Sequence, residues 1–365
     1  MKKNRIKFVA LMLTVIMIVT ACAPAATPAA PATPNAPVAG TQETPEPPAA
    51  LPLIGITVYD YSNVYTSYIR RGIYNYSTDN NLAEFHSVDA QNDPVRQLEQ
   101  IDTFIAMGVD GLIVMPVDIG ATGVMVERAQ EADIPIIFVN RTPPTEVLNM
   151  WDKVIYVGLP LESSGEMQAE MIVEHWNSGR IVDRNGDGVM QFVTVMGDLG
   201  HPDAEARVRG NQRVLEASGI QFEELDRQIA NWNTTRARDI TEIWLGRWAD
   251  DIDLVISNND AMALGVIEAI RAQGLDIPVV GINALPEVHQ MIIDGEYFGS
   301  VLSDPWKQAQ ASVDLVLNRI AGRDWFDGND WGQYYDPVES SVRILDVKIT
   351  AENIQLAIDA YANCM

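Results

Sequence analysis

The chain has 365 residues, of which 47% are hydrophobic and 21% charged, so it is long enough for a large core and for two domains. Its formal net charge of -25 argues against nucleic acid as a partner, because phosphate binding needs a basic face. The two cysteines do not support a disulfide framework, and the four histidines lack zinc-like spacing. No role is evident for Cys364, for which an unpaired surface thiol is one interpretation.

Residues 1–21 have the features of a signal peptide. A basic stretch with Lys2, Lys3 and Arg5 precedes an apolar run from Phe8 to Val19 that is too short for a comfortable membrane span. Small residues then lead to Cys22, a pattern that resembles the cleavage box of bacterial lipoproteins and predicts lipidation of Cys22. Residues 22–52 are rich in Ala, Pro and Thr and cannot bury a core, so they predict a disordered tether. We therefore expect an extracytoplasmic protein that is lipid-anchored to the cell membrane.

From Leu53 onward, short apolar runs alternate with amphipathic, helix-like stretches. Runs such as GLIVMPVD, IPIIFVN, QFVTVMGD and DLVISNND are rich in Val and Ile, which suits strands buried on both faces. Alternation of strands with helices predicts crossover units and parallel sheets. About ten such strands exceed one comfortable sheet, so the pattern predicts an α/β fold with two lobes of about five strands each.

Acidic or amide side chains follow most of these apolar runs. In open parallel sheets, ligands bind at the carboxyl edge of the strands, so two such edges facing each other would form a polar cleft. Asp and Asn at these positions are also common helix N-caps, and Asp304 before Pro305 is typical of a helix start. The residues concerned are Asp60, Asp89, Asp118, Asn140, Asp198, Asn259, Asn283 and Asp304.

The segment DRNGDGVMQ has the oxygen spacing of a calcium loop. Side-chain oxygens alternate along it, a glycine stands at the sharp turn, and one backbone carbonyl would complete the set. The twelfth position should be Glu and is Thr194, which lies inside an apolar strand. The segment is therefore either a plain acidic turn or a metal loop whose last carboxylate comes from elsewhere. The loop ligands would be Asp183, Asn185, Asp187, Val189 (through its carbonyl) and Gln191.

The segment GHPDAEAR follows the next strand. It places Asp203 and Arg207 one helical turn apart, directly after His201. Asp203 and Arg207 either form an ordinary ion pair at a helix start or, together with His201, present hydrogen-bond donors and acceptors to a ligand at the edge of a cleft. Local spacing does not separate the two interpretations.

The phrases DRNGDGVMQF, GHPDAEAR, SNNDAMALG, GINALPE and IPIIFVN, taken together, resemble the periplasmic galactose/glucose-binding proteins of the type I periplasmic binding-protein superfamily. The resemblance runs from Leu53 to about Ile349. It implies an α/β fold of two doubly wound parallel-sheet lobes joined by a three-crossing hinge. The implied lobes are residues 53–159 plus 304–342 (N-terminal) and residues 160–303 plus 343–365 (C-terminal).

The resemblance also implies a monosaccharide site. Tyr65 and Trp232 would sandwich the apolar faces of the sugar, while polar side chains contact its hydroxyls. Asn63 and Asn283 stand where the family has Asp, and Ser303 where it has Asn. The resemblance therefore implies capture of a glucose- or galactose-like aldose by hinge closure, with a pentose, a polyol or an autoinducer as the alternative ligand. The implied ligand-binding residues are Asn63, Tyr65, Asn140, His201, Asp203, Arg207, Trp232, Asn259, Asn283 and Ser303.

Further expectations follow from the same resemblance. Asp253 stands where the family supplies the missing Glu to a Ca²⁺ ion. The implied partners are the permease of an ABC transporter and, as a second candidate, a chemoreceptor, and the protein is expected to be a monomer. The sequence lacks the motifs GxxxxGK[ST], HExxH and GxSxG, so we expect a binding protein, with a glycoside-processing enzyme as the less favoured alternative.

Overall fold

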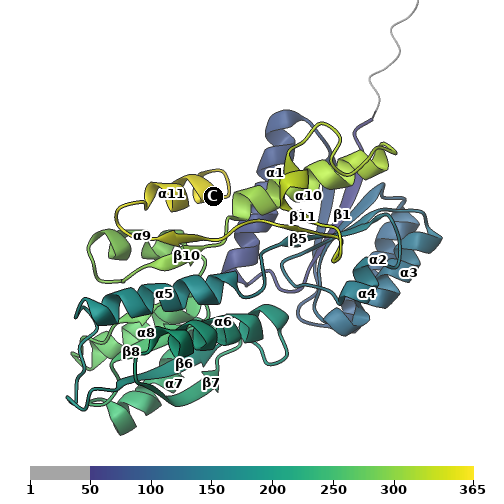
Figure 1. Ribbon diagram of the computed structural model, residues 1–365. Coiled ribbons are helices and arrows are strands. Elements are labelled where there is room, and N and C mark those ends of the chain that lie inside the picture. Colours follow the sequence, from purple (N-terminus) through teal and green to yellow (C-terminus); the bar gives the residue numbers. More distant parts are fainter. Residues whose placement is uncertain (1–49) are drawn as a thin grey trace, which may run out of the picture. The chain divides into compact units, whose positions relative to one another are not determined.

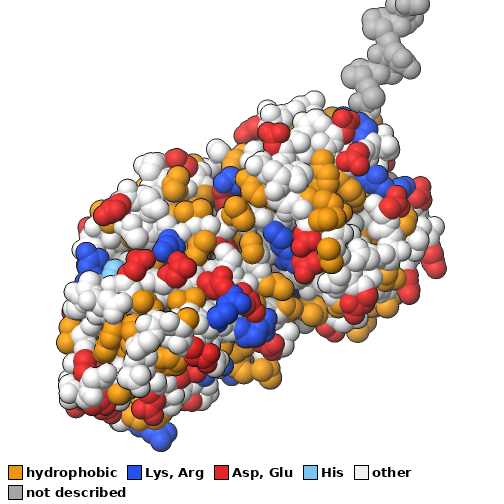
Figure 2. Space-filling view, in the orientation of Figure 1, with side chains coloured by type: hydrophobic (Ala, Val, Ile, Leu, Met, Phe, Trp, Pro, Cys, Tyr) orange, Lys and Arg blue, Asp and Glu red, His pale blue; other side chains and the backbone are white. Residues whose placement is uncertain are grey.

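The computed structural model describes residues 50–365, which form one compact unit. The predicted signal peptide, Cys22 and nearly all of the tether lie outside the described residues. None of the helices in residues 50–365 combines the length and the apolar character that a membrane span requires. On the face shown in Figure 2, acidic side chains are interspersed with Lys and Arg.

The first sheet has seven strands in the order β11-β12-β5-β4-β3-β1-β2. All neighbours pair in parallel except β11 and β12, and the order β2-β1-β3-β4-β5 is that of a doubly wound fold. The strands are β1 (Leu53–Val58), β2 (Glu84–Asp89), β3 (Gly111–Met115), β4 (Ile136–Val139), β5 (Val154–Gly158), β11 (Tyr335–Asp336) and β12 (Ser341–Arg343).

Helices pack around this sheet, and α10 joins it from late in the chain (Figure 1). Capping residues set the helix ends: Asp93, just before Pro94, accepts from the backbone N–H groups of Val95 and Arg96, and Gly108 ends the same helix at φ 73°. The elements are α1 (Val64–Asn80), α2 (Pro94–Met107), η1 (Ile119–Ala121), α3 (Thr122–Glu131), α4 (Thr145–Leu148), α10 (Pro305–Ile320) and η2 (Trp331–Tyr334).

The second lobe repeats the same winding. Its parallel sheet has the order β7-β6-β8-β9, and Asn283 bridges to Leu302 in β10, which pairs antiparallel with β13. The strands are β6 (Met190–Met196), β7 (Phe222–Ile229), β8 (Leu254–Ser257), β9 (Val279–Val280), β10 (Ser300–Leu302) and β13 (Val347–Ile349). The helices are α5 (Ser163–Asn177), α6 (Pro202–Ser218), α7 (Thr234–Trp248), α8 (Asp260–Ala272), α9 (Pro286–Ile293) and α11 (Gln355–Ala362).

Three segments of chain connect the lobes: residues 159–162 after β5, residues 303–304 after β10 and residues 344–346 after β12. The predicted fold class, two parallel-sheet α/β lobes joined by three crossings, is therefore confirmed. The expected count of about five strands in each lobe is wrong for the first sheet, because β11 and β12 return late in the chain and extend its edge. Cys364 is a buried thiol rather than a surface one.

Candidate functional site

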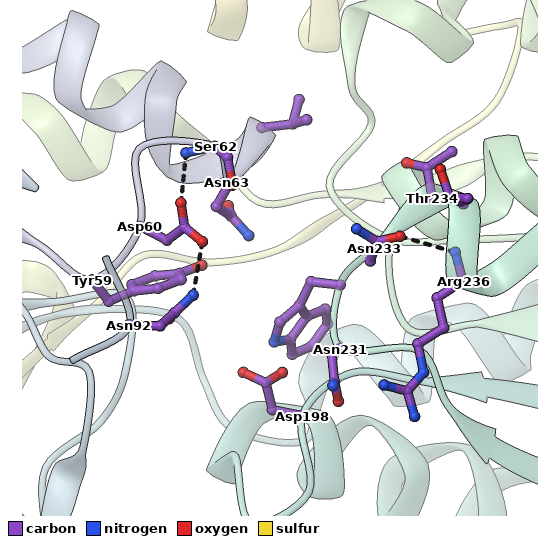
Figure 3. Close-up of a pocket in the computed structure, with 13 residues that line it drawn as sticks. Tyr59, Asp60, Ser62, Asn63, Asn92, Asp198, Asn231, Asn233, Thr234 and Arg236 are labelled. Atoms are coloured by element: carbon purple, nitrogen blue, oxygen red, sulfur yellow. Dashed lines mark hydrogen bonds between the residues drawn. The ribbon is translucent and has the colours of Figure 1, made fainter. Parts of the chain in front are cut away.

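The winding of the two sheets places the site. In each sheet the chain leaves its first strand, β1 or β6, at the point where the strand order reverses, and ligands bind at such switch points. The loops after β1 and β6 line one cavity of about 770 Å³ together with the loop after β7. Figure 3 shows Tyr59, Asp60 and Asn92 on one side of this outer chamber and Asp198, Asn231 and Arg236 on the other.

An inner pocket adjoins the outer chamber and shares Tyr59, Asn63 and Trp232 with it. The structure brings together nine of the ten residues predicted to bind ligand, and adds Tyr59. The inner pocket is lined by Tyr59, Asn63, Tyr65, Asn140, His201, Asp203, Arg207, Trp232, Asn259 and Asn283. These residues come from both lobes, so a molecule held here would contact both.

Three of the pocket residues are also helix N-caps. The Oδ1 atom of Asn63 accepts from the backbone N–H of Thr66 at 3.1 Å, and that of Asn259 accepts from Met262 at 2.9 Å. The Nδ1 atom of His201 accepts from the N–H of Asp203 at 3.2 Å. Because the cap uses the acceptor, each side chain keeps a donor for the pocket, Nδ2 of the amides and Nε2–H of the imidazole.

His201 is a neutral donor at physiological pH. Burial lowers the pKa of its imidazole well below the usual value, and the positive charges of Arg141 and Arg207 lower it further. With Nδ1 accepting from the backbone, the single proton resides on Nε2. The ring can therefore donate one hydrogen bond into the pocket without bringing a charge.

Asp203 and Arg207 do not form the ion pair that helical spacing alone would allow. Arg207 instead donates from Nη1 to the backbone carbonyl of Asn258 at 2.6 Å, and within residues 50–365 Asp203 takes part in no salt bridge. Burial raises the pKa of Asp203, while the charges of Arg207, Arg343 and Arg141 lower it. Asp203 is the only carboxylate among the residues that line the inner pocket, so it is the strongest acceptor offered to a ligand there.

Two aromatic side chains complete the inner pocket. The hydroxyl of Tyr65 donates to the backbone carbonyl of Ser303 at 3.0 Å, which fixes the ring. Trp232 has a left-handed backbone (φ 57°), and its indole occupies the space where a Cβ on Gly197 would stand, 2.1 Å from the nearest ring atom. Its edge contacts the His201 ring at a centroid distance of 5.1 Å. Both rings therefore have fixed positions without a ligand.

Several buried polar atoms of the inner pocket have no partner. Among the described residues, Nε of Arg207, Nε1 of Trp232 and Nδ2 of Asn283 are buried and make no hydrogen bond. A buried donor without an acceptor costs about 1–3 kcal/mol, so native structures rarely keep several side by side. The pocket is thus preorganised for a small molecule with several acceptors.

Ser303 is the exception among the predicted ligand residues. It is fully buried and does not line the inner pocket. Its short side chain hydrogen-bonds instead to Oδ1 of Asp346, at 3.4 Å. The structure therefore places the Ser303 hydroxyl within the hinge, and its contact with a ligand stays a prediction.

Sequence reasoning missed Arg141, which connects the lobes. Its guanidinium donates to the carbonyl of Val117 and lies 4.1 Å from the centre of the Tyr59 ring, both in the first lobe. It also pairs with Asp198 of the second lobe at 2.8 Å. No motif contains Arg141 and Asp198 together, although Asp198 was singled out at the end of its strand.

The DRNGDG loop lies apart from both pockets. Both carboxylate oxygens of Asp183 accept from backbone N–H groups of the loop, those of Gly186 and Gly188, at 2.7 Å. Asp253 joins this loop to β8, because its two oxygens accept from Arg184 N–H at 2.8 Å and from Gln191 N–H at 2.7 Å. Within residues 50–365 no three His, Cys, Asp or Glu side chains form a group arranged to hold a metal ion.

Charge still accumulates at this loop. Burial raises the pKa of Asp253, and the negative charges of Asp183 and Asp187 raise it further, so three carboxylates lie within electrostatic reach of one another. With the side-chain oxygens of Asn185 and Gln191 they form a set of hard oxygen donors. The donor types therefore suit a calcium ion.

Two sheets wound alike, three crossings and a polar cleft lined from both sides define a two-lobed ligand-binding protein. Residues 54–324 match the periplasmic binding protein domain family. The chain belongs to this family.

Relatives support the assignment. The chain is 35% identical over 302 residues to the D-galactose/methyl-galactoside binding periplasmic protein MglB of Haemophilus influenzae, covering 82% of this chain and 90% of the relative. It is 27% identical over 272 residues to a xylitol-binding protein of Mycolicibacterium smegmatis, covering 74% and 73%. A solved ABC transporter solute binding protein from Bacillus halodurans C-125 with bound myo-inositol has a TM-score of 0.71 and 26% identity, covering 87% of this chain and all of that one.

Proposed function

We propose that this protein captures a monosaccharide outside the cytoplasm and delivers it to an ABC transporter. The observation that carries the proposal is the pair of unpartnered donors in the inner pocket, Nε1 of Trp232 and Nδ2 of Asn283, beside the Asp203 carboxylate and two fixed aromatic rings. A sugar supplies what these groups need, since its oxygens accept hydrogen bonds, its hydroxyls donate to a carboxylate, and its C–H faces stack on rings.

The ligand class that we propose is a glucose- or galactose-like aldose. The galactoside-binding relative supports it, since its match covers most of both chains. The xylitol-binding relative and the inositol-bound structure support a pentose or polyol as the second candidate. Asn63 and Asn283 bear on the choice, because amides line the pocket at both positions and Asp203 is left as its only carboxylate.

Closure of the lobes is the proposed mechanism. Asn63 and Tyr65 come from the first lobe, whereas His201, Asp203 and Arg207 come from the second, so only the closed arrangement offers every contact at once. A ligand with higher affinity for this arrangement shifts the population towards it. The proposed role is binding and transport rather than catalysis, in keeping with the periplasmic binding protein family and the galactoside-binding relative.

Isothermal titration calorimetry with D-galactose, D-glucose, D-ribose, D-xylose, xylitol and myo-inositol tests the proposal. We expect saturable heat with at least one aldose, and a higher melting temperature for the same sugar. Binding of xylitol or myo-inositol alone would favour the second candidate. No response to any of the six compounds would refute a role in sugar capture.

The anchor and the partners belong to the same proposal. Lipidation of Cys22, followed by the tether, would hold a monomer at the outer face of the cell membrane, where the permease, and in the second case a chemoreceptor, would meet it. Globomycin blocks cleavage of lipoprotein signal peptides, so the drug should cause the precursor to accumulate. Substitution Cys22→Ala should release the protein from the membrane fraction, whereas Cys364→Ala should not.

We further propose that Ca²⁺ binds the DRNGDG loop as a structural ion. The proposed ligands are Asp183, Asn185, Asp187, Gln191, the carbonyl of Val189 and, as the last carboxylate, Asp253. The bound ion would neutralise the negative charges of the three neighbouring carboxylates. The loop residues line neither sugar-site pocket, so EDTA should lower the melting temperature more than it lowers sugar affinity. The opposite order, or no effect of EDTA and of added Ca²⁺, would refute this site.

A further inference from the structure

Asp346 is a buried carboxylate in the third segment that connects the lobes. It is 4% exposed and lies between β12 and β13. Its Oδ1 accepts from the Ser303 hydroxyl, which belongs to the second connecting segment. Its Oδ2 is buried and has no hydrogen-bond partner among the described residues. The hinge therefore contains an acceptor whose donor is missing.

The complementary donor lies in the sugar site. Nε of Arg207 is also buried and unpartnered, although the same guanidinium donates to the carbonyl of Asn258 through Nη1. Arg207 and Asp346 are within electrostatic reach, because the charge of Arg207 lowers the pKa of Asp346. Protein interiors rarely contain a carboxyl group and a guanidinium that are both buried and each leave one hydrogen-bonding atom unsatisfied.

Opposing effects determine the pKa of Asp346. Burial raises its pKa to about 7, and Asp203 adds to the rise, while Arg207 and the hydroxyls of Ser163 and Ser303 oppose it. The pKa of the Tyr65 hydroxyl is also raised well above its usual value, mainly by burial and partly by the negative charge of Asp346. At neutral pH the ligand-free closed form thus holds Asp346 about half protonated, since the pH is then close to the pKa.

We propose that Asp346 is a positioning residue that pairs with Arg207 when ligand closes the lobes, so that sugar binding expels a proton from the hinge. The pairing satisfies both unpartnered atoms and fixes the guanidinium towards the ligand. It also connects the ligand-contacting helix α6 directly to the segment that moves between the lobes. This inference rests on the proposed function.

The pH dependence follows from the sign of the change. Pairing favours the charged carboxylate, so the ligand-bound pKa of Asp346 is lower than the free one, and binding near pH 7 releases about half a proton. Affinity then rises with pH and levels off above about pH 7.5. If ligand binds only the ionised form, affinity at pH 5.5 is about 25-fold weaker than at pH 7.5. His201 does not contribute in this range, because its pKa is already well below the usual value.

The test is calorimetry of wild type in phosphate and in Tris at pH 7, with D-galactose and the other five compounds as probes. Two buffers with different ionisation enthalpies give the number of protons released. Wild type should release about half a proton, and Asp346→Asn should release none and lose the pH dependence. Asp314→Asn is the matched control, since Asp314 is a half-buried carboxyl bonded to Tyr76 and Trp331 outside the pocket lining.

A second variant tests the inference if Asp346→Asn does not fold. Ser303→Ala removes the hydroxyl donor of Asp346, so the midpoint of the pH profile should move upward. Binding without proton release in wild type, an unchanged profile in Asp346→Asn, or an unmoved midpoint in Ser303→Ala would overturn the inference while leaving sugar binding intact. Absence of binding to all six probes would overturn the proposed function and this inference with it.

Discussion

Substitution Asp198→Asn should weaken ligand binding by loosening the closed state. Asp198 belongs to the second lobe and pairs at 2.8 Å with Arg141, which is anchored in the first lobe through Val117 and Tyr59. A hydrogen bond between charged groups contributes about 1.5–3 kcal/mol when shielded. The Asp198 side chain is 32% exposed, so solvent screening reduces the expected loss to about 1 kcal/mol, or about fivefold in Kd.

The loss should appear mainly in the rate of ligand release, because the pair holds lobes that have already closed. Stopped-flow dissociation and calorimetry at 50 and 500 mM NaCl would measure it, and the difference between wild type and variant should shrink at the higher salt. Small-angle scattering of the ligand-free variant should show a larger radius of gyration. Asp102→Asn is the matched control: its partner Arg128 is also 2.8 Å away, but both residues belong to the first lobe.

The reasoning would be refuted by a variant whose Kd, release rate and scattering profile all equal those of wild type. That result would mean that the Arg141–Asp198 pair contributes nothing to closure. A similar loss in Asp102→Asn would also refute it, since the effect would then reflect net charge.

Three further predictions concern the pocket, the packing behind it and pH. Trp232→Ala should weaken sugar binding at least about tenfold in calorimetry, because it removes one of two stacking faces while leaving the polar contacts. Gly165→Ala should lower the free energy of unfolding by about 1–3 kcal/mol in urea titrations, since its Cβ would lie 2.1 Å from the carbonyl oxygen of Arg207 and force α5 away from α6. Asp260 has a pKa raised to about 7 by burial, so the folded state binds more protons than the unfolded state and stability falls as pH rises from about 4 to 7. Asp260→Asn should show a shallower fall in chemical denaturation over that range, and an unchanged slope would contradict the assignment.

The strand-end residues show what local sequence can predict. Asn259 fitted two interpretations, a helix cap and a cleft contact, and the structure gives it both positions. The two are compatible because an amide carries an acceptor and a donor, and the cap uses only the acceptor. Sequence pattern therefore predicted two lobes with parallel sheets, whereas most of the pocket residues were predicted from the family resemblance.

Sequence pattern did not predict the contacts between segments that are far apart in the chain. Ser303 and Asp346 acquire each other as neighbours only when two separate crossings meet, and Arg141 reaches Asp198 only when the two lobes meet. Neither spacing nor a strand-end rule identifies these contacts. Ser303 shows this clearly: its position after β10 is that of a cleft residue, whereas its hydroxyl is bonded within the hinge. The signal that could have flagged Asp346 is chemical: an Asp stands within the largely apolar run ILDVKI.

The distribution of donors and acceptors explains why ligand and closure should be coupled. The pocket holds buried donors without acceptors at Arg207, Trp232 and Asn283, and the hinge holds an acceptor without a donor at Asp346. Each unpaired group makes the unliganded closed state less favourable, by about 1–3 kcal/mol. A sugar that bonds the donors of Trp232 and Asn283 removes part of this penalty, and pairing of Arg207 with Asp346 removes more. Because the open form can expose the same groups to water, the ligand stabilises closure chiefly by satisfying atoms that closure would otherwise leave unbonded.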